Sequence, residues 1–294
     1  MQRVIVEVRW GPLQGRKAII EAGKALRVGR TDRADLVVPH DAKLSGVHFE
    51  LAWDGSTCRL RDMKSAVGTL LGGERVEEAH VANGGWVRAG ETDFSVYFEG
   101  ATPPREMDED YEDYEPETPE AIASKERALE VLREESTREP LYAVLDAARD
   151  ERILELLRES VEDYRSLYDG VQGETLADVA PYLVRLPKES RLLDALVREG
   201  WGKRWGLYTT CKLPFKEVRR HFRRFLMVEN DETGEQMYFR FYDPGTMRVF
   251  LPTCTPRQTA ELFGDLGAFF VEGTKGDILR FKAGDAMTTE PSGA

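Results

Sequence analysis

The sequence contains few cysteines and few histidines, the residues that most often build disulfides and metal sites. Only three cysteines and four histidines occur among 294 residues. Cys58, Cys211 and Cys254 are odd in number, far apart and without Cys-x-x-Cys spacing, which argues against a disulfide framework and against zinc. The histidines are equally dispersed. We therefore expect no metal, and a protein that works in the reducing cytoplasm.

Long apolar runs and the common catalytic motifs are also missing. No apolar run approaches the roughly 18–20 residues that cross a bilayer. The first ten residues, MQRVIVEVRW, lack the apolar core of a signal peptide. None of the motifs Gly-x-Ser-x-Gly, Walker A, His-Glu-x-x-His or Gly-x-Gly-x-x-Gly is present. We expect no membrane segment, no cofactor and no catalytic residue.

Negative charge is concentrated in one short segment. The formal net charge is −12, yet residues 1–100 carry 14 basic and 14 acidic side chains. Residues 101–120 carry one arginine, nine acidic residues and four prolines. Repulsion and proline predict an extended linker over 101–120, followed by a connecting helix over 121–139. The overall excess of acid argues against nucleic acid as a partner.

The first hundred residues have the pattern of short strands. Segments such as VIVEVRW, ALRVGR and TCRLRD alternate apolar and polar side chains and are separated by Gly, Asp and Asn. Many short alternating segments at regular spacing are typical of a β-sandwich. We therefore expect an all-β domain over residues 1–100.

Three short motifs occur in order in this region: Gly29-Arg30, the run from Ser45 to His48, and the run from Asp62 to Thr69. Together they resemble the forkhead-associated (FHA) domain, a phosphopeptide-binding β-sandwich. The resemblance implies that Arg30 holds the peptide, Ser45 contacts the phosphate and His48 braces the loop from beneath. Arginine suits this role because it donates charge-assisted, bidentate hydrogen bonds. The positions expected to be structural are Gly29, His48, Gly68 and Thr69.

Two parts of the motif depart from the family pattern. The position after the serine is usually a polar or basic donor and here is Gly46; the peptide-gripping positions of the next loop are Ala66 and Val67. Each lost donor is worth about 1 kcal/mol net or more, so weaker phosphothreonine binding is expected. Lys43 and Lys64 offer electrostatic compensation. The alternative is a fold retained as a docking or dimerisation surface.

From residue 140 the apolar period changes, and strand patterns alternate with amphipathic helical ones. This alternation indicates a layered α/β domain over residues 140–284, with a disordered tail over 285–294, so the chain is expected to be multidomain. The expected strands are 141–148, 180–186, 205–211, 236–244, 268–273 and 277–284. The expected helices are 152–164, 190–201, 215–226 and 256–266.

The segment from residue 141 to about 273 contains the motifs LYAVLDAA, SLYDG, APYLVRL and EVRRHFRRFL, followed by Arg240, Tyr242, Asp243 and Pro244. These motifs, and the last four residues most specifically, resemble the effector-adaptor (chaperone) domain of type VI secretion systems. The resemblance implies binding of a secreted toxin effector and of the secretion spike protein. A helical lobe usually follows in this family; only about 20 residues remain after 273, so a short or absent lobe is expected. Asp243 is expected to cap a helix or bind an arginine rather than to act in catalysis.

The expected helix over 215–226 is strongly basic. Its buried face should consist of Val218, Phe222, Phe225 and Leu226, which follow the helical period. Its other faces carry Arg219, Arg220, Arg223 and Arg224. Two interpretations remain open: a docking surface for an acidic partner segment, or a solvated face with ion pairs inside the domain.

Two functions are compatible with these patterns. The favoured hypothesis is a cytoplasmic, non-enzymatic adaptor that carries a toxin cargo to the spike, with the FHA module adding a regulatory or docking contact. The alternative is a signalling scaffold whose FHA module binds a phosphothreonine protein after a kinase has acted. The adaptor requires cargo binding by the second domain, whereas the scaffold requires partners that appear only after phosphorylation.

The composition of residues 101–120 leads to a first testable prediction. Mild proteolysis of the full chain should cut within this segment, because it has neither an apolar period nor a regular turn pattern. Gel electrophoresis and mass spectrometry of the fragments should then show two stable products. A chain that resists cutting there, at protease levels that digest a denatured control, would show that the segment is held by folded structure.

Overall fold

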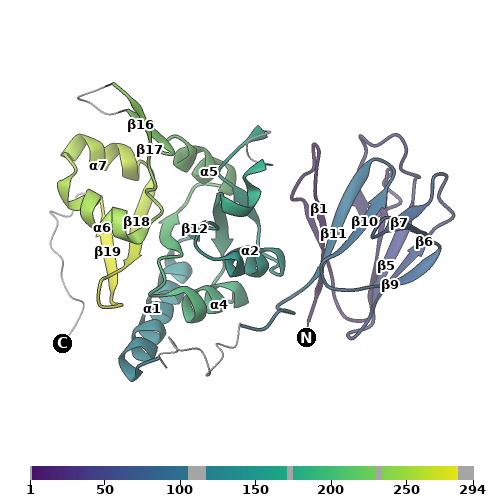
Figure 1. Ribbon diagram of the computed structural model, residues 1–294, viewed down its shortest axis with the longest axis horizontal. Helices are drawn as coiled ribbons and strands as arrows, with labels where there is room; N and C mark the ends of the chain where they lie inside the picture. The colour runs from purple at the N-terminus through teal and green to yellow at the C-terminus, as the bar shows by residue number, and fades with distance from the viewer. Residues whose placement is uncertain (1, 105–116, 171–174, 230–233, 284–294) are drawn as a thin grey trace. The chain divides into compact units, whose positions relative to one another are not determined.

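The computed structural model describes residues 2–104, 117–170, 175–229 and 234–283. It divides into two compact units, residues 1–103 with 158–161 and the remainder of the chain (Figure 1). Residues 105–116 of the expected linker and the expected tail lie outside the described residues. Within the described ranges, no helix is long and apolar enough to cross a membrane. The expected order, an all-β region followed by a mixed α/β region, is confirmed.

The first unit contains two β-sheets, antiparallel throughout except for the pair β3–β4. In spatial order, the six-stranded sheet consists of β2 (Lys17–Ile20), β1 (Val4–Val8), β11 (Thr92–Phe98), β10 (Gly85–Ala89), β7 (Thr69–Leu71) and β8 (Glu74–Val76). The five-stranded sheet consists of β4 (Leu36–Val37), β3 (Lys24–Gly29), β5 (Phe49–Trp53), β6 (Cys58–Asp62) and β9 (Glu78–Val81). Inward-facing side chains of both sheets form one apolar core.

The register of the five-stranded sheet brings three loops to one end. Val28 of β3 pairs with Phe49 of β5, and Phe49 pairs with Asp62 of β6. Strand β3 therefore ends, β5 begins and β6 ends at the same level. The loops that carry Arg30, Ser45 and residues 63–68 leave the sheet together.

The second unit is built on a six-stranded antiparallel sheet with helices on both faces. Its strands, in spatial order, are β13 (Tyr164–Ser166), β14 (Pro181–Leu186), β12 (Leu141–Asp146), β15 (Gly206–Cys211), β18 (Leu266–Glu272) and β19 (Ile278–Lys282). One face packs on α1 (Pro119–Arg138), α2 (Glu151–Arg158) and α4 (Arg191–Gly200). The other packs on α5 (Phe215–Arg223), α6 (Pro244–Thr253) and α7 (Pro256–Phe263). The unit also contains the short helix Ala177–Val179 and the hairpin of β16 (Met227–Glu229) and β17 (Gln236–Tyr238).

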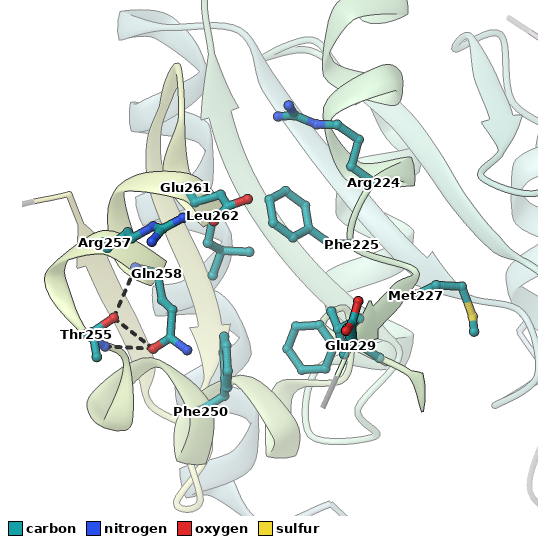
Figure 2. A pocket seen from close by; sticks show the side chains of 12 residues that line it. Arg224, Phe225, Met227, Glu229, Phe250, Thr255, Arg257, Gln258, Glu261 and Leu262 are labelled. Carbon is teal, nitrogen blue, oxygen red and sulfur yellow. Dashed lines mark hydrogen bonds between the residues drawn. The ribbon is translucent and has the colours of Figure 1, made fainter. Parts of the chain in front are cut away.

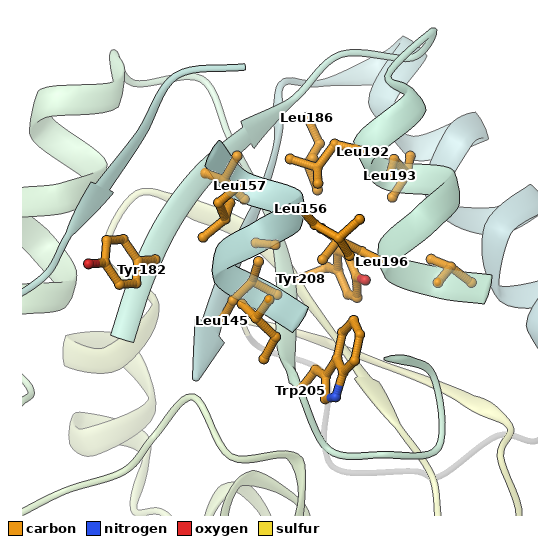
Figure 3. Close-up of a cluster of buried hydrophobic side chains, with 14 of the residues drawn as sticks. Leu145, Leu156, Leu157, Tyr182, Leu186, Leu192, Leu193, Leu196, Trp205 and Tyr208 are labelled. Atoms are coloured by element: carbon orange, nitrogen blue, oxygen red, sulfur yellow. The ribbon is translucent and has the colours of Figure 1, made fainter. Parts of the chain in front are cut away.

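Alternation along β12 explains why both faces of the sheet are covered. Leu141, Ala143 and Leu145 point into the core beneath α2 and α4, while Tyr142 and Val144 point into the core on the opposite face. Figure 3 shows the first of these cores, in which leucines of α2 and α4 pack over the sheet beside aromatic side chains of β15 and the preceding turn. Because the strands are mostly apolar on both faces and each helix has an apolar face, the unit forms three layers: helices, sheet and helices.

Two of the expected elements are wrong in extent. The helix expected over 152–164 ends at Arg158, and Tyr164–Ser166 instead pair with β14 as an edge strand. Backbone pairing of residues 164–166 with the sheet outweighs the helical spacing of their apolar side chains. The strand expected over 236–244 is limited to Gln236–Tyr238, and residues 244–253 form α6, which was not expected. The start signal for α6 was present, because Asp243 is a capping residue followed by a proline at the first helical position.

The core in Figure 3 gives a second prediction. Leu196 on α4 is 1% exposed, so Leu196→Ala removes buried methyl groups and leaves a cavity. The free energy of unfolding of the second unit should fall by about 2–5 kcal/mol. Hydrogen exchange of the full chain in denaturant, read on peptides from β12 and α4, measures this loss.

Leu176→Ala is the matched control, since Leu176 is 43% exposed and its truncation should change little. Peptides from the first unit should exchange at the wild-type rate in both variants. Equal stability of the two variants would contradict the packing described for α4.

Candidate functional sites

At one end of the first unit, the loop after β3 lies directly against the loop before β5. Gly29 makes this possible, because a Cβ atom there would lie 2.2 Å from the carbonyl oxygen of Gly46. The backbone N–H of Arg30 donates to the carbonyl of Ser45 at 2.9 Å. The Arg30 side chain is exposed and has no hydrogen-bond or ion-pair partner among the described residues. Its guanidinium is therefore available to an anion.

Ser45 and His48 fix the geometry of the loop before β5. The Ser45 Oγ accepts a hydrogen bond from the backbone N–H of Ala66 at 3.0 Å, which leaves its O–H free to donate. His48 is fully buried, and its Nδ1 accepts the Ser45 N–H at 3.0 Å. Because Nδ1 accepts, Nε2 carries the proton and donates to the Gly68 carbonyl at 3.1 Å. The histidine thus links the two loops through its two ring nitrogens.

Asp62 organises the turn between β6 and β7. Its carboxylate accepts the Ser65 N–H at 2.9 Å, the Ser65 hydroxyl at 2.6 Å and the Thr69 hydroxyl at 2.7 Å. Ser65 in turn accepts the Gly68 N–H at 2.9 Å. Burial raises the pKa of Asp62, but the hydrogen bonds from Ser65 and Thr69 outweigh it and leave the pKa lowered. The turn is held by side chains, not by a β-ladder.

The cations expected to compensate for missing donors differ in their availability. Lys43 pairs with Glu91 at 2.9 Å, whereas Lys64 is exposed with no ion pair among the residues described. Ala66 contributes its backbone N–H and Val67, 47% exposed, contributes no polar side chain. Two arginines that sequence reasoning missed, Arg33 and Arg75, lie against Gly46 and Gly68. Their spacing in the sequence gives no sign of these contacts.

In the second unit, the four arginines of the basic helix region have different partners. Arg219 donates to the carbonyl of Ser166 at 2.8 Å and to Asp169 at 2.7 Å, and Arg223 pairs with Asp169 at 2.5 Å. Both therefore hold the loop after β13. Arg220 is 76% exposed and pairs with Glu217 one turn earlier, while Arg224 donates to His221 at 3.0 Å. Only the last two remain accessible to a partner.

The Arg240–Pro244 motif takes part in an ion-pair cluster around two buried carboxylates at the start of α6. Asp243 caps the helix through the Thr246 N–H at 3.2 Å and accepts both arms of Arg204, at 2.9 and 2.5 Å. Burial raises the pKa of Asp243, but the Arg204 hydrogen bonds leave it lowered. Arg240 pairs with the buried Asp146 at the end of β12, and burial raises the pKa of Tyr242 to about 12. These contacts fasten α6 to the sheet.

A groove of about 670 Å³ lies between the β16–β17 hairpin and helices α6 and α7 (Figure 2). Its apolar lining is provided by Phe225, Met227, Val228, Phe239, Phe250 and Leu262. Arg224, Glu229, Arg257 and Glu261 supply charges of both signs. Thr255 and Gln258 close a capping box at the start of α7, drawn as dashed lines in Figure 2. The groove is therefore lined by apolar side chains and by the capped N-terminus of α7.

The cysteine thiols are held in their neutral form. Burial raises the pKa of Cys58 to about 12 and also raises the pKa of Cys211 and of Cys254. A nucleophilic or metal-binding cysteine requires the thiolate. The environment of all three thiols therefore disfavours such chemistry.

The Asp62 turn gives a third prediction, on pH dependence. Asp62→Asn should destabilise the first unit by about 1–3 kcal/mol at neutral pH, since buried donors lose a charged acceptor. The lowered pKa of Asp62 means that its contribution is complete above the ordinary value of 3.8 and is lost as the pH falls through the lower folded value. The stability difference between wild type and variant should therefore stay constant from about pH 7 to about pH 5 and shrink towards about pH 3.

Hydrogen exchange of peptides from the first unit at each pH measures this difference. Asp32→Asn, on an exposed loop residue, makes the same charge change and is the control. A difference that stays constant down to about pH 3 would contradict the role given to the carboxylate.

Comparison with known proteins agrees with this division of the chain. Residues 7–100 match the family model "Inner membrane component of T3SS, cytoplasmic domain", and residues 141–261 match DUF4123, a "domain of unknown function". A search of curated proteins gave no match.

Solved FHA domains are similar to the first unit. The FhaA FHA domain, solved in complex with the intracellular domain of Rv3910, is 30% identical, with 32% of this chain and 98% of that chain covered and a TM-score of 0.29. An FHA domain from a study of phosphothreonine-dependent FHA interactions is 29% identical (32% and 95% covered, TM-score 0.30). The first FHA domain of Rv1747 from Mycobacterium tuberculosis is 27% identical (33% and 97% covered, TM-score 0.28). The chain is thus similar to FHA domains over its first hundred residues and matches DUF4123 over residues 141–261.

Proposed function

We propose that this chain is a cytoplasmic, non-enzymatic adaptor of type VI secretion that binds a secreted toxin and delivers it to the spike protein. The observation that carries the proposal is the DUF4123 match over residues 141–261, because this segment resembles type VI effector adaptors and contains nearly the whole groove lining. The neutral thiols and the purely structural contacts of Asp243 support a binding role rather than catalysis.

The groove of the second unit is the proposed cargo site. Its floor of phenylalanine side chains offers apolar area, while Arg224, Arg257, Glu229 and Glu261 offer charges of both signs at its edges. An amphipathic segment of the toxin, with apolar side chains on one side and mixed charges beside them, fits this chemistry. Exposed Met227 adds a flexible apolar side chain, which suits contact with segments of varied shape.

The first unit is proposed to supply a phosphothreonine-dependent contact. Arg30 is available to an anion and the Ser45 hydroxyl has a proton left to donate. These features also favour a second candidate function, a scaffold that gathers partners only after a kinase has acted. The two candidates differ in which unit binds first and in whether binding requires phosphate.

Substitution in the groove tests the adaptor function. Met227→Asp places a charge at the edge of the groove and should reduce co-purification of a toxin cargo by about tenfold or more, because an unpaired carboxylate is costly to bury under the cargo. The measurement is the ratio of toxin to adaptor after co-expression of both full chains. Met237→Asp is the matched control, since Met237 lies on the same hairpin, is 46% exposed against 48% for Met227, and does not line the groove.

Treatment with phosphatase separates the two candidates. The adaptor retains its toxin after the treatment and loses it in the Met227→Asp variant. A scaffold loses its partners on dephosphorylation, and its partner binding is unchanged in the Met227→Asp variant. Retention of toxin by both methionine variants would show that the groove is not the cargo site.

A further inference from the structure

Gly46 lacks the side chain that the phosphate loop of this family usually carries, and another residue fills the vacant space. A Cβ atom built on Gly46 would lie 2.8 Å from Nη2 and 3.7 Å from Cζ of Arg33. The guanidinium of Arg33, from the loop between β3 and β4, therefore occupies the volume in which a side chain at position 46 would begin. A basic group is present beside Ser45, although it comes from a different loop.

Backbone contacts hold the two loops in this arrangement. The Thr31 N–H and hydroxyl both donate to the Gly46 carbonyl, at 3.2 and 3.1 Å. The Ala34 N–H donates to the Thr31 carbonyl at 3.0 Å and closes the turn that carries Arg33. The backbone on both sides of the contact between Arg33 and Gly46 is thus held by hydrogen bonds.

The charge of Arg33 is not neutralised by neighbouring acids. Arg33 is exposed and, in the part of the chain that the structure describes, its side chain has neither a hydrogen bond nor an ion pair. The same holds for the side chains of Arg30 and Lys64, on the loops that leave this end of the sheet. Unneutralised cations on adjacent loops repel each other, and a doubly charged anion relieves that repulsion.

We propose that Arg33 is a phosphate-binding residue and supplies the donor that Gly46 lacks, acting beside Arg30 and Ser45. The proposal rests on the phosphothreonine-dependent contact assigned above to the first unit. Guanidinium suits this task because it donates two parallel hydrogen bonds to phosphate oxygens. Arg33 comes from the opposite loop, so the phosphate would be held between the two loops.

The experiment measures binding of the full chain to a degenerate phosphothreonine peptide pool by fluorescence anisotropy, with the unphosphorylated pool as reference. Arg33→Ala should weaken binding by about ten- to a hundredfold, the loss of one charge-assisted contact. Arg59→Ala is the matched control, since Arg59 lies towards the far end of β6 and pairs with Glu78 at 3.3 Å. Its affinity should equal that of wild type.

A swap of the two positions separates phosphate binding from a structural role. In the double variant Arg33→Ala with Gly46→Arg, a guanidinium reaches the same volume from the other loop and should restore most of the affinity. Wild-type binding that Arg33→Ala leaves unchanged, or a loss that the swap does not restore, would overturn the role of Arg33 alone. A wild-type chain that does not distinguish the two pools would overturn the phosphothreonine function itself, and the role of Arg33 with it.

Discussion

The end of the first unit that carries Arg30 and Ser45 depends on one buried side chain, His48. His48 receives the Ser45 N–H on one ring nitrogen and donates to the Gly68 carbonyl with the other. Both partners belong to loops, so the imidazole replaces the ladder of hydrogen bonds that strands would supply. Because each nitrogen has a fixed role, only one neutral tautomer satisfies both loops. The position of Ser45, and with it the space beside Gly46, follows from this constraint.

Much of the fold of the first unit could be predicted from the sequence, because the patterns that indicate its strands and loops each lie within a few consecutive residues. The alternation of apolar and polar residues predicts the all-β region. The motif around Ser45 and His48 indicates the loop that His48 holds. The contact of Arg33 with Gly46 could not be predicted in this way. It depends on how two loops close over each other, which no period or motif within either loop records. The same is true of the pairing of Lys43 with Glu91, which removes an expected compensating cation.

In the second unit, sequence reasoning succeeded for elements buried on both sides and failed at the edges. The strands 141–148, 180–186 and 205–211 were apparent because β12, β14 and β15 are buried on both faces and carry mostly apolar side chains. Helix α6 was missed because its sequence, PGTMRVFLPT, is apolar on more than one side and contains a second proline. The sequence around Asp243 did contain a helix start, and the apolar run before it concealed that signal.

Counting basic residues is a poor guide to function in this chain, whereas their pairing is informative. The basic helix region appeared in the sequence as the more prominent cationic surface, yet Arg219 and Arg223 are bound to the loop after β13 and stabilise the fold. The first unit has equal numbers of acids and bases, yet Arg30, Arg33 and Lys64 have no acidic partner among the residues described. A cation that is already in an ion pair is less available to bind a second anion. Electrostatic recognition is therefore expected at the neutral unit rather than at the arginine-rich helix, and the proposed binding of cargo by the second unit would depend mainly on its apolar groove.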